Sequence, residues 1–204
     1  MRLAIADPPY PPLYSERFDA AGGESRIVSR SRSLRWYGDG SRGHKDPAPA
    51  DFHPEASKWD DLGAHRQLML DLIDKYDGWA IATTPDGLGA YGALPVSARI
   101  MSWVRPNGMP GGGRLISRWE PVIVFVPEAR RARSTGMLVS DVLVAAAPRI
   151  GFAGAKPPEW TRWVLDALGY APGADSVTDV FPGSGSVAAA ADGMLAFATA
   201  EGAS

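Results

Sequence analysis

The apolar run at residues 3–6 and the turn that follows it constrain the fold most. The run predicts a short buried strand, and Asp7-Pro8-Pro9-Tyr10 ends it. Proline fixes its own φ and lacks an N–H, so this DPPY turn is rigid and offers two acceptors, the Asp7 carboxylate and the Pro8 carbonyl. Such a pair at the mouth of a strand suits a flat ring that bears an amino group, such as a nucleobase. An ordinary turn explains the four residues equally well, so the motif alone decides nothing.

A second strand and turn lie near the other end of the chain. A strand-like run ends at Asp179, a glycine-bearing loop follows at residues 181–185, and the alanine-rich stretch from Val187 to Ala191 predicts a helix. Strand, glycine turn and helix in this order are typical of sites for nucleotide-type cofactors. Glycine has no Cβ, so the backbone of this glycine loop can approach a ligand closely.

The segments between these turns predict one α/β domain, because 204 residues suffice for a buried sheet flanked by helices. Strands and helices alternate, with an antiparallel pair of strands expected at the sheet edge. The expected elements are a helix at 60–78, strands at 79–84, 97–104 and 121–126, a helix at 157–169 and a last short strand at 195–199.

Residues 11–59 show no convincing period and predict a long loop. Its central part combines basic and aromatic residues, and guanidinium groups pair with phosphates while flat rings stack on exposed bases. The candidate nucleic-acid contacts are Arg26, Arg30, Arg32, Arg35, Trp36, Arg42 and Lys45. A solvated loop without such a role explains this composition as well.

In their order, these motifs resemble the S-adenosylmethionine-dependent DNA amino-methyltransferases in which DPPY precedes an FxGxG loop. The resemblance covers most of the chain. It includes residues 7–10, the helix and strand ending at Thr84, the paired strands at 97–126 with Trp119-Glu120-Pro121, the Lys156-Pro157 segment with its helix, and the loop at 181–185. It implies a Rossmann-like methyltransferase sheet in permuted motif order, mostly parallel with an antiparallel edge pair. The whole chain would be a single methyltransferase domain, with a basic loop insertion at about 24–58.

The resemblance also implies roles for individual residues. The expected catalytic residues are Asp7, Pro8, Pro9 and Tyr10, with the ring of Tyr10 stacked on the base. The expected cofactor-binding residues are Lys156, Pro157, Asp179, Phe181, Gly183, Ser184, Gly185 and Glu201. Glu201 is the acid that would follow the last strand and bind the ribose hydroxyls of S-adenosylmethionine.

The expected substrate is the N6 amine of adenine in DNA, because cytosine-directed relatives often carry serine where this chain has Asp7. Methylation of cytosine N4 or of RNA on the same fold is the main alternative. A catalytically inactive relative that binds nucleic acid is another. Relatives with this arrangement are commonly dimers, so a homodimer is a further expectation.

Composition excludes several other classes of site. The chain has no cysteine, which excludes disulfides, thiolate zinc sites and a cysteine nucleophile. His44, His53 and His65 share no metal-ligand spacing, so no metal is expected. No apolar run approaches the roughly 20 residues of a membrane span, and no signal sequence is recognised, so we expect a cytoplasmic protein. The net charge of −2 disfavours indiscriminate coating of nucleic acid.

Overall fold

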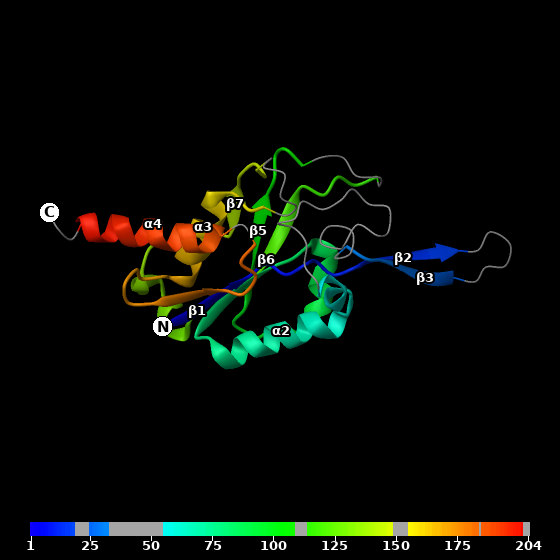
Figure 1. Cartoon of the computed structure of the whole chain (residues 1–204), viewed down its shortest axis with the longest axis horizontal. Coiled ribbons are helices and arrows are strands. Elements are labelled where there is room, and N and C mark those ends of the chain that lie inside the picture. The colour runs from blue at the N-terminus through cyan, green and yellow to red at the C-terminus, as the bar shows by residue number, and fades with distance from the viewer. Residues whose placement is uncertain (19–24, 33–54, 109–113, 149–154, 184, 202–204) are drawn as a thin grey trace.

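The computed structural model describes residues 1–18, 25–32, 55–108, 114–148, 155–183 and 185–201 (Figure 1). The strands are β1 (Arg2–Ala6), β2 (Leu13–Phe18), β3 (Ser25–Arg30), β4 (Gly78–Ala82), β5 (Arg99–Val104), β6 (Trp119–Phe125), β7 (Val142–Val144) and β8 (Ser176–Asp179). The α-helices are α2 (Leu62–Lys75), α3 (Pro158–Leu168) and α4 (Ser186–Glu201). Short 3-10 helices are η2 (Ala56–Asp60), η3 (Pro85–Tyr91), η4 (Glu128–Arg130) and η5 (Arg133–Thr135).

Six strands form the main sheet in the order β7-β5-β6-β4-β1-β8. β1 lies between β4 and β8 and runs parallel to both, whereas β6 runs antiparallel to β4 and to β5. The three-residue strand β7 pairs in parallel with β5 and lies outside this antiparallel pair. The expected mostly parallel α/β sheet with an antiparallel pair is therefore confirmed.

Helices cover both faces of this sheet, with α3 and α4 on one side and α2 on the other (Figure 1). Side chains of β1 alternate between the two layers. Leu3 and Ile5 pack in the cluster that contains α3, while Ala4 and Ala6 pack in the cluster that contains α2. Every residue of β4 is buried, as expected of a strand covered on both faces.

Local signals explain where the two predicted central helices begin and end. The Asp61 carboxylate accepts a 2.9 Å hydrogen bond from the Gly63 amide and so caps α2. Pro158 occupies the start of α3, where a missing N–H costs nothing. Gly169 ends α3 in the left-handed conformation, at a φ of 69°. Both helices confirm the sequence prediction.

The prediction of a long loop over residues 11–59 is wrong in its first part. β2 and β3 pair antiparallel, with Leu13 opposite Arg30 and Phe18 opposite Ser25. This hairpin extends away from the main sheet (Figure 1). Its strands lack a clean alternation of apolar and polar residues, so periodicity does not reveal them.

The predicted strand at 195–199 is also wrong, because α4 continues through these residues to Glu201. The segment from 187 onward is rich in alanine, the residue with the highest helix propensity, and Gly193 does not interrupt it. In the part of the chain described here, no helix combines the length and apolar character that crossing a membrane requires.

Candidate functional site

The DPPY turn and the glycine loop lie side by side although they belong to opposite ends of the sequence. β1 and β8 are neighbouring parallel strands, with Ile5 opposite Asp179. Just beyond this pair, the Val180 amide donates a 2.9 Å hydrogen bond to the Ile5 carbonyl. Ligands of open α/β sheets bind at the carboxyl ends of parallel strands, which is where both turns begin. The two turns therefore begin at the same edge of the sheet.

Asp7 lies at the end of β1 with its carboxylate mostly covered, since its side chain keeps 28% of its exposure. The Lys156 ammonium donates a 2.7 Å hydrogen bond to Asp7 Oδ2. Burial raises the pKa of the Asp7 carboxyl, the Lys156 charge opposes this rise, and the nearby Glu120 carboxylate adds to it. Pro8 and Pro9 are buried and fix the backbone that carries this side chain.

Tyr10 connects Asp7 and its lysine to a second buried acid. The Tyr10 hydroxyl donates to Glu120 Oε2 over 2.7 Å and accepts from Lys156 Nζ over 2.9 Å. Glu120 also pairs with Arg105, at 2.7 Å between Oε1 and NH1. We call Asp7, Tyr10, Arg105, Glu120 and Lys156 the charge network. Its hydrogen bonds fix the position of the Tyr10 hydroxyl.

The sequence analysis gave no role to Glu120 or Arg105. Glu120 lies in β6, a strand that is otherwise apolar at its centre, and its side chain is 9% exposed. A carboxylate buried in such a strand needs a positively charged or hydrogen-bonding partner. That isolated acid was the one signal in the sequence that pointed toward this network.

The glycine loop begins with a hydrogen bond from the Phe181 amide to Asp179 Oδ1, at 3.1 Å. Burial raises the pKa of the Asp179 carboxyl, this amide opposes the rise, and the charge of Asp7 adds to it. The Phe181 ring packs edge-on against Trp59, with 5.0 Å between ring centroids. Asp7, at the end of β1, is therefore close enough to Asp179, at the end of β8, to raise the pKa of its carboxyl.

The end of the glycine loop is open at one backbone position. Gly185 has a φ of 73°, and a Cβ at this position would meet no described residue within 4 Å apart from its chain neighbours. α4 starts at the next residue, and helix N-termini attract negatively charged groups. A ligand that carries both an ammonium and a carboxylate would find partners in Asp179 and the start of α4.

Lys156 and Pro157, both expected to bind the cofactor, are buried at the start of α3. The Lys156 ammonium is directed to the DPPY turn by its bonds to Asp7 and Tyr10. Pro157 is the N-cap residue of α3. The structure thus brings Lys156 to the catalytic residues expected from the sequence.

Arg32, expected to contact nucleic acid, makes contacts within the protein. Its guanidinium pairs with Asp86 at 2.9 Å and donates to Thr84 Oγ1 at 2.8 Å. It therefore ties the segment after β3 to the loop after β4. Arg26 and Arg30 lie on β3. The remaining candidates fall outside the described residues, namely Arg35, Trp36, Arg42, Lys45 and the cofactor candidate Ser184.

Glu201 is the last residue of α4, where the sequence analysis expected it to follow a strand. Its proposed binding of ribose hydroxyls depended on that strand, because acids at strand ends reach the carboxyl edge of the sheet. The correction to a helix therefore removes the reason for assigning this role to Glu201.

Within the described ranges, no group of three or more His, Cys, Asp or Glu side chains is placed to hold a metal ion. His65 is fully buried, and its Nε2 lies 2.8 Å from the Trp59 carbonyl. Burial lowers the pKa of His65, so the neutral ring is favoured. This histidine is accordingly a core residue.

Comparisons with known proteins do not assign this chain to a family. A scan against protein-family models finds no match. A search of curated proteins finds no relative either. The functional interpretation therefore depends on the residues of the site and on their arrangement.

Proposed function

We propose that the chain is a DNA methyltransferase that uses S-adenosylmethionine to methylate the exocyclic N6 of adenine. The adjacency of the DPPY turn and the glycine loop supports this proposal most, and the bond from Val180 to Ile5 holds the two together. Group transfer needs its two reactants in contact, because correct positioning can remove a large part of the barrier. Two turns at the ends of neighbouring strands offer one place for two ligands.

The DPPY turn would hold the amino group of the base. The lone pair of this amine is delocalised into the adenine ring, so the nitrogen is a poor nucleophile. The Asp7 carboxylate and the Pro8 carbonyl, by accepting its two N–H groups, favour a pyramidal nitrogen with an available lone pair. The nitrogen releases one proton as it gains a carbon, and the Asp7 carboxylate is the base placed to accept that proton.

The glycine loop would hold the cofactor. S-adenosylmethionine, when bound, would supply a methyl group from its positively charged sulfur, and breaking of that carbon–sulfur bond would leave a neutral thioether. Asp179 would bind the ammonium of its amino-acid part, and the N-terminus of α4 would bind the carboxylate. Gly183 is exposed and Gly185 has open space at its Cβ position, so the loop backbone can approach this part of the ligand.

Adenine in a duplex uses its N6 amine in base pairing, so the base must leave the helix to reach Asp7. Extrusion of a base costs a few kcal/mol, which stacking and hydrogen bonding in a pocket can offset. Aromatic side chains contribute about 1–3 kcal/mol per stacked base. Tyr10 is a suitable partner, because its hydroxyl is fixed by Glu120 and Lys156.

The β2–β3 hairpin is the element we expect to contact the DNA backbone. It extends from the body of the protein (Figure 1), and its register places Arg17 opposite Arg26. Arginines pair with phosphates and position a protein on a duplex without reading sequence. Arg32, paired with Asp86, would anchor the base of the hairpin to the sheet.

The proposal is tested by incubating the protein with labelled S-adenosylmethionine and unmodified DNA, and then identifying the methylated nucleoside by mass spectrometry. We expect N6-methyldeoxyadenosine. N4-methyldeoxycytidine, or methylation of RNA alone, would favour the main alternative on the same fold.

Thermal unfolding with and without S-adenosylmethionine separates an enzyme from an inactive nucleic-acid-binding relative. A protein that binds the cofactor gains about 2.7 kcal/mol of stability at a hundredfold excess over its dissociation constant. A relative that has lost the cofactor site gains none.

A further inference from the structure

Lys156 is the most enclosed charge at the site, with only 4% of its side chain exposed. It lies 149 residues from Asp7 in sequence and 2.7 Å from it in space. The ammonium also lies 5.3, 5.7 and 5.6 Å from the ring centroids of Tyr10, Trp103 and Trp160. Aromatic faces favour a cation, so these rings help to retain the charge.

The rest of the charge network balances this cation. Glu120 lies 3.7 Å from Lys156 and 2.7 Å from Arg105. Two carboxylates therefore face two cationic side chains, with the Tyr10 hydroxyl between Glu120 and Lys156. A buried charge is costly without a partner, and removal of one member leaves another uncompensated.

We propose that Lys156 is a positioning residue for methyl transfer, which keeps the Asp7 carboxylate ionised and oriented toward the amine of the base. This inference rests on the proposed function and deepens it. It also moves Lys156 from the cofactor side of the site, where the family resemblance placed it, to the side of the acceptor base. Glu120 and Arg105 act behind it, by fixing Tyr10 and the ammonium.

The electrostatic surroundings of Asp7 explain why a lysine is needed there. Burial disfavours the ionised form of the Asp7 carboxyl, and the nearby Glu120 carboxylate adds to this effect. Tyr91 packs in the cluster that contains α2, where burial raises its pKa and so keeps its hydroxyl neutral. Lys156 is the cation that opposes these effects at Asp7. Without this cation the pKa of the Asp7 carboxyl would rise further, so a higher pH would be needed for it to accept a proton from the amine.

The test is the pH dependence of kcat/KM in Lys156→Met, a substitution whose flexible side chain suits an aromatic surrounding. An opposite charge at this distance lowers a carboxyl pKa by about 1–3 units, so the acid limb should move upward by about that much. The dissociation constant for S-adenosylmethionine should stay within about threefold of the wild type, a change of less than about 1 kcal/mol. Lys156→Arg, which restores the positive charge, should return the limb toward the wild-type position.

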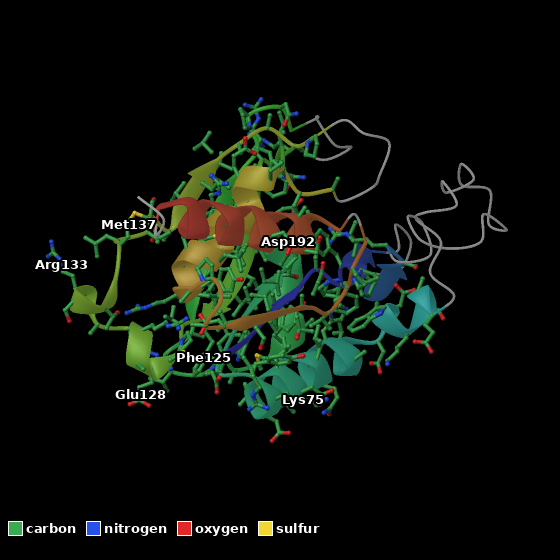
Figure 2. All side chains as sticks on the ribbon, turned by 60° about the vertical axis from the view of Figure 1, so that its left-hand side comes forward. Lys75, Phe125, Glu128, Arg133, Met137 and Asp192 are labelled. Atoms are coloured by element: carbon green, nitrogen blue, oxygen red, sulfur yellow. The ribbon has the colours of Figure 1, made fainter. Side chains whose placement is uncertain are left out.

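Lys75→Met is the matched control, because Lys75 lies on the outer side of α2 and makes an exposed 3.7 Å pair with Asp71 (Figure 2). This variant should leave the pH profile unchanged. If Lys156→Met instead weakened cofactor binding by more than about tenfold, or about 1.4 kcal/mol, and left the acid limb in place, Lys156 would be a cofactor ligand and the inference would be overturned.

A second measurement does not require activity. Urea unfolding of Asp7→Asn, Lys156→Met and the double variant gives the coupling between the two side chains. We expect the double variant to be more stable than the sum of the single losses predicts, and the coupling to weaken in acid. Additive losses would refute the pairing. If the two side chains are coupled but the protein transfers no methyl group, the pairing of Asp7 with Lys156 stands and the proposed function is refuted.

Discussion

The amide of Val180 donates a 2.9 Å hydrogen bond to the carbonyl of Ile5, and this bond joins the two ends of the chain at one edge of the sheet. It sets Asp7 beside Asp179, so that two acids of different expected roles share a local environment. One acid would serve the base and the other the cofactor.

Tyr10→Phe should weaken the protein while preserving the aromatic ring for stacking. The substitution removes the hydroxyl that donates to Glu120 and accepts from Lys156. Hydrogen bonds to charged groups contribute about 1.5–3 kcal/mol each, so the loss of two should lower the free energy of unfolding in urea by about 3 kcal/mol or more. Unchanged stability would contradict the charge network.

Gly78→Ala should destabilise the sheet. A Cβ at Gly78 would lie 2.5 Å from Cδ and 2.6 Å from Cγ of Pro127, a ring that cannot turn away. Overpacking of this kind typically costs about 1–3 kcal/mol. Gly89→Ala is the matched control, since no described residue other than its chain neighbours lies within 4 Å of its Cβ position. Thermal unfolding should separate the two variants, and equal midpoints would refute this packing.

Asp175 should make stability depend on acid pH. Burial alone would raise the pKa of this carboxyl, but hydrogen bonds from Arg130, the Met1 amino group and the Ala171 amide outweigh it and hold the pKa well below its usual range. Because folding lowers this pKa, the ionised form stabilises the protein above the usual value of about 3.9. This stabilisation is lost as the pH falls from about 3.9 through the lowered pKa of Asp175 in the folded protein.

The measurement is urea unfolding of Asp175→Asn between neutral and acid pH. The variant should be less stable than the wild type by about 2 kcal/mol at neutral pH, and the difference should shrink in acid. Asp74→Asn, at an exposed position of α2, serves as the control. A difference that stayed constant with pH would contradict the assignment.

The sequence predicted the helices and strands whose signals lie within their own residues. The apolar runs before Asp7 and Asp179, and the helix that Asp61 caps, each carry their own signal and were placed correctly. The pairing of β1 with β8 is seen only in the folded chain, where parallel strands of an α/β sheet bring their carboxyl ends to one edge. The pattern of apolar and polar residues did not reveal the β2–β3 hairpin. At the end of α4, the helix propensity of the residues was underestimated.

The charge network could not be predicted in the same way. Lys156 was noticed as part of a motif, but its partners Asp7 and Glu120 lie on different strands far away in sequence. Only the packing of α3 against the sheet decides which buried acid a lysine meets. Arg32 shows the same limit. The basic and aromatic composition of its segment suggested a contact with phosphate, but in the folded chain its guanidinium pairs with Asp86.

Arg32 and the arginines of β3 should differ in their effect on DNA binding. Each phosphate contact contributes about 0.9 to the slope of log K against log salt concentration. Arg26→Ala and Arg30→Ala should each reduce the slope by about that amount. Arg32→Ala should leave the slope unchanged, because its guanidinium is paired with Asp86. Binding isotherms at several salt concentrations measure this slope for each variant. A reduced slope for Arg32→Ala would contradict its role as an anchor.

The most direct test of the shared site is the rate at which labelled methyl passes from S-adenosylmethionine to unmodified DNA in the wild type, Asp7→Ala and the exposed control Asp74→Ala. The account predicts label in N6-methyldeoxyadenosine for the wild type and the control. It predicts transfer slower by about 10²–10³-fold in Asp7→Ala, with cofactor binding retained. Absence of transfer by the wild type, or transfer by Asp7→Ala at the wild-type rate, would contradict it.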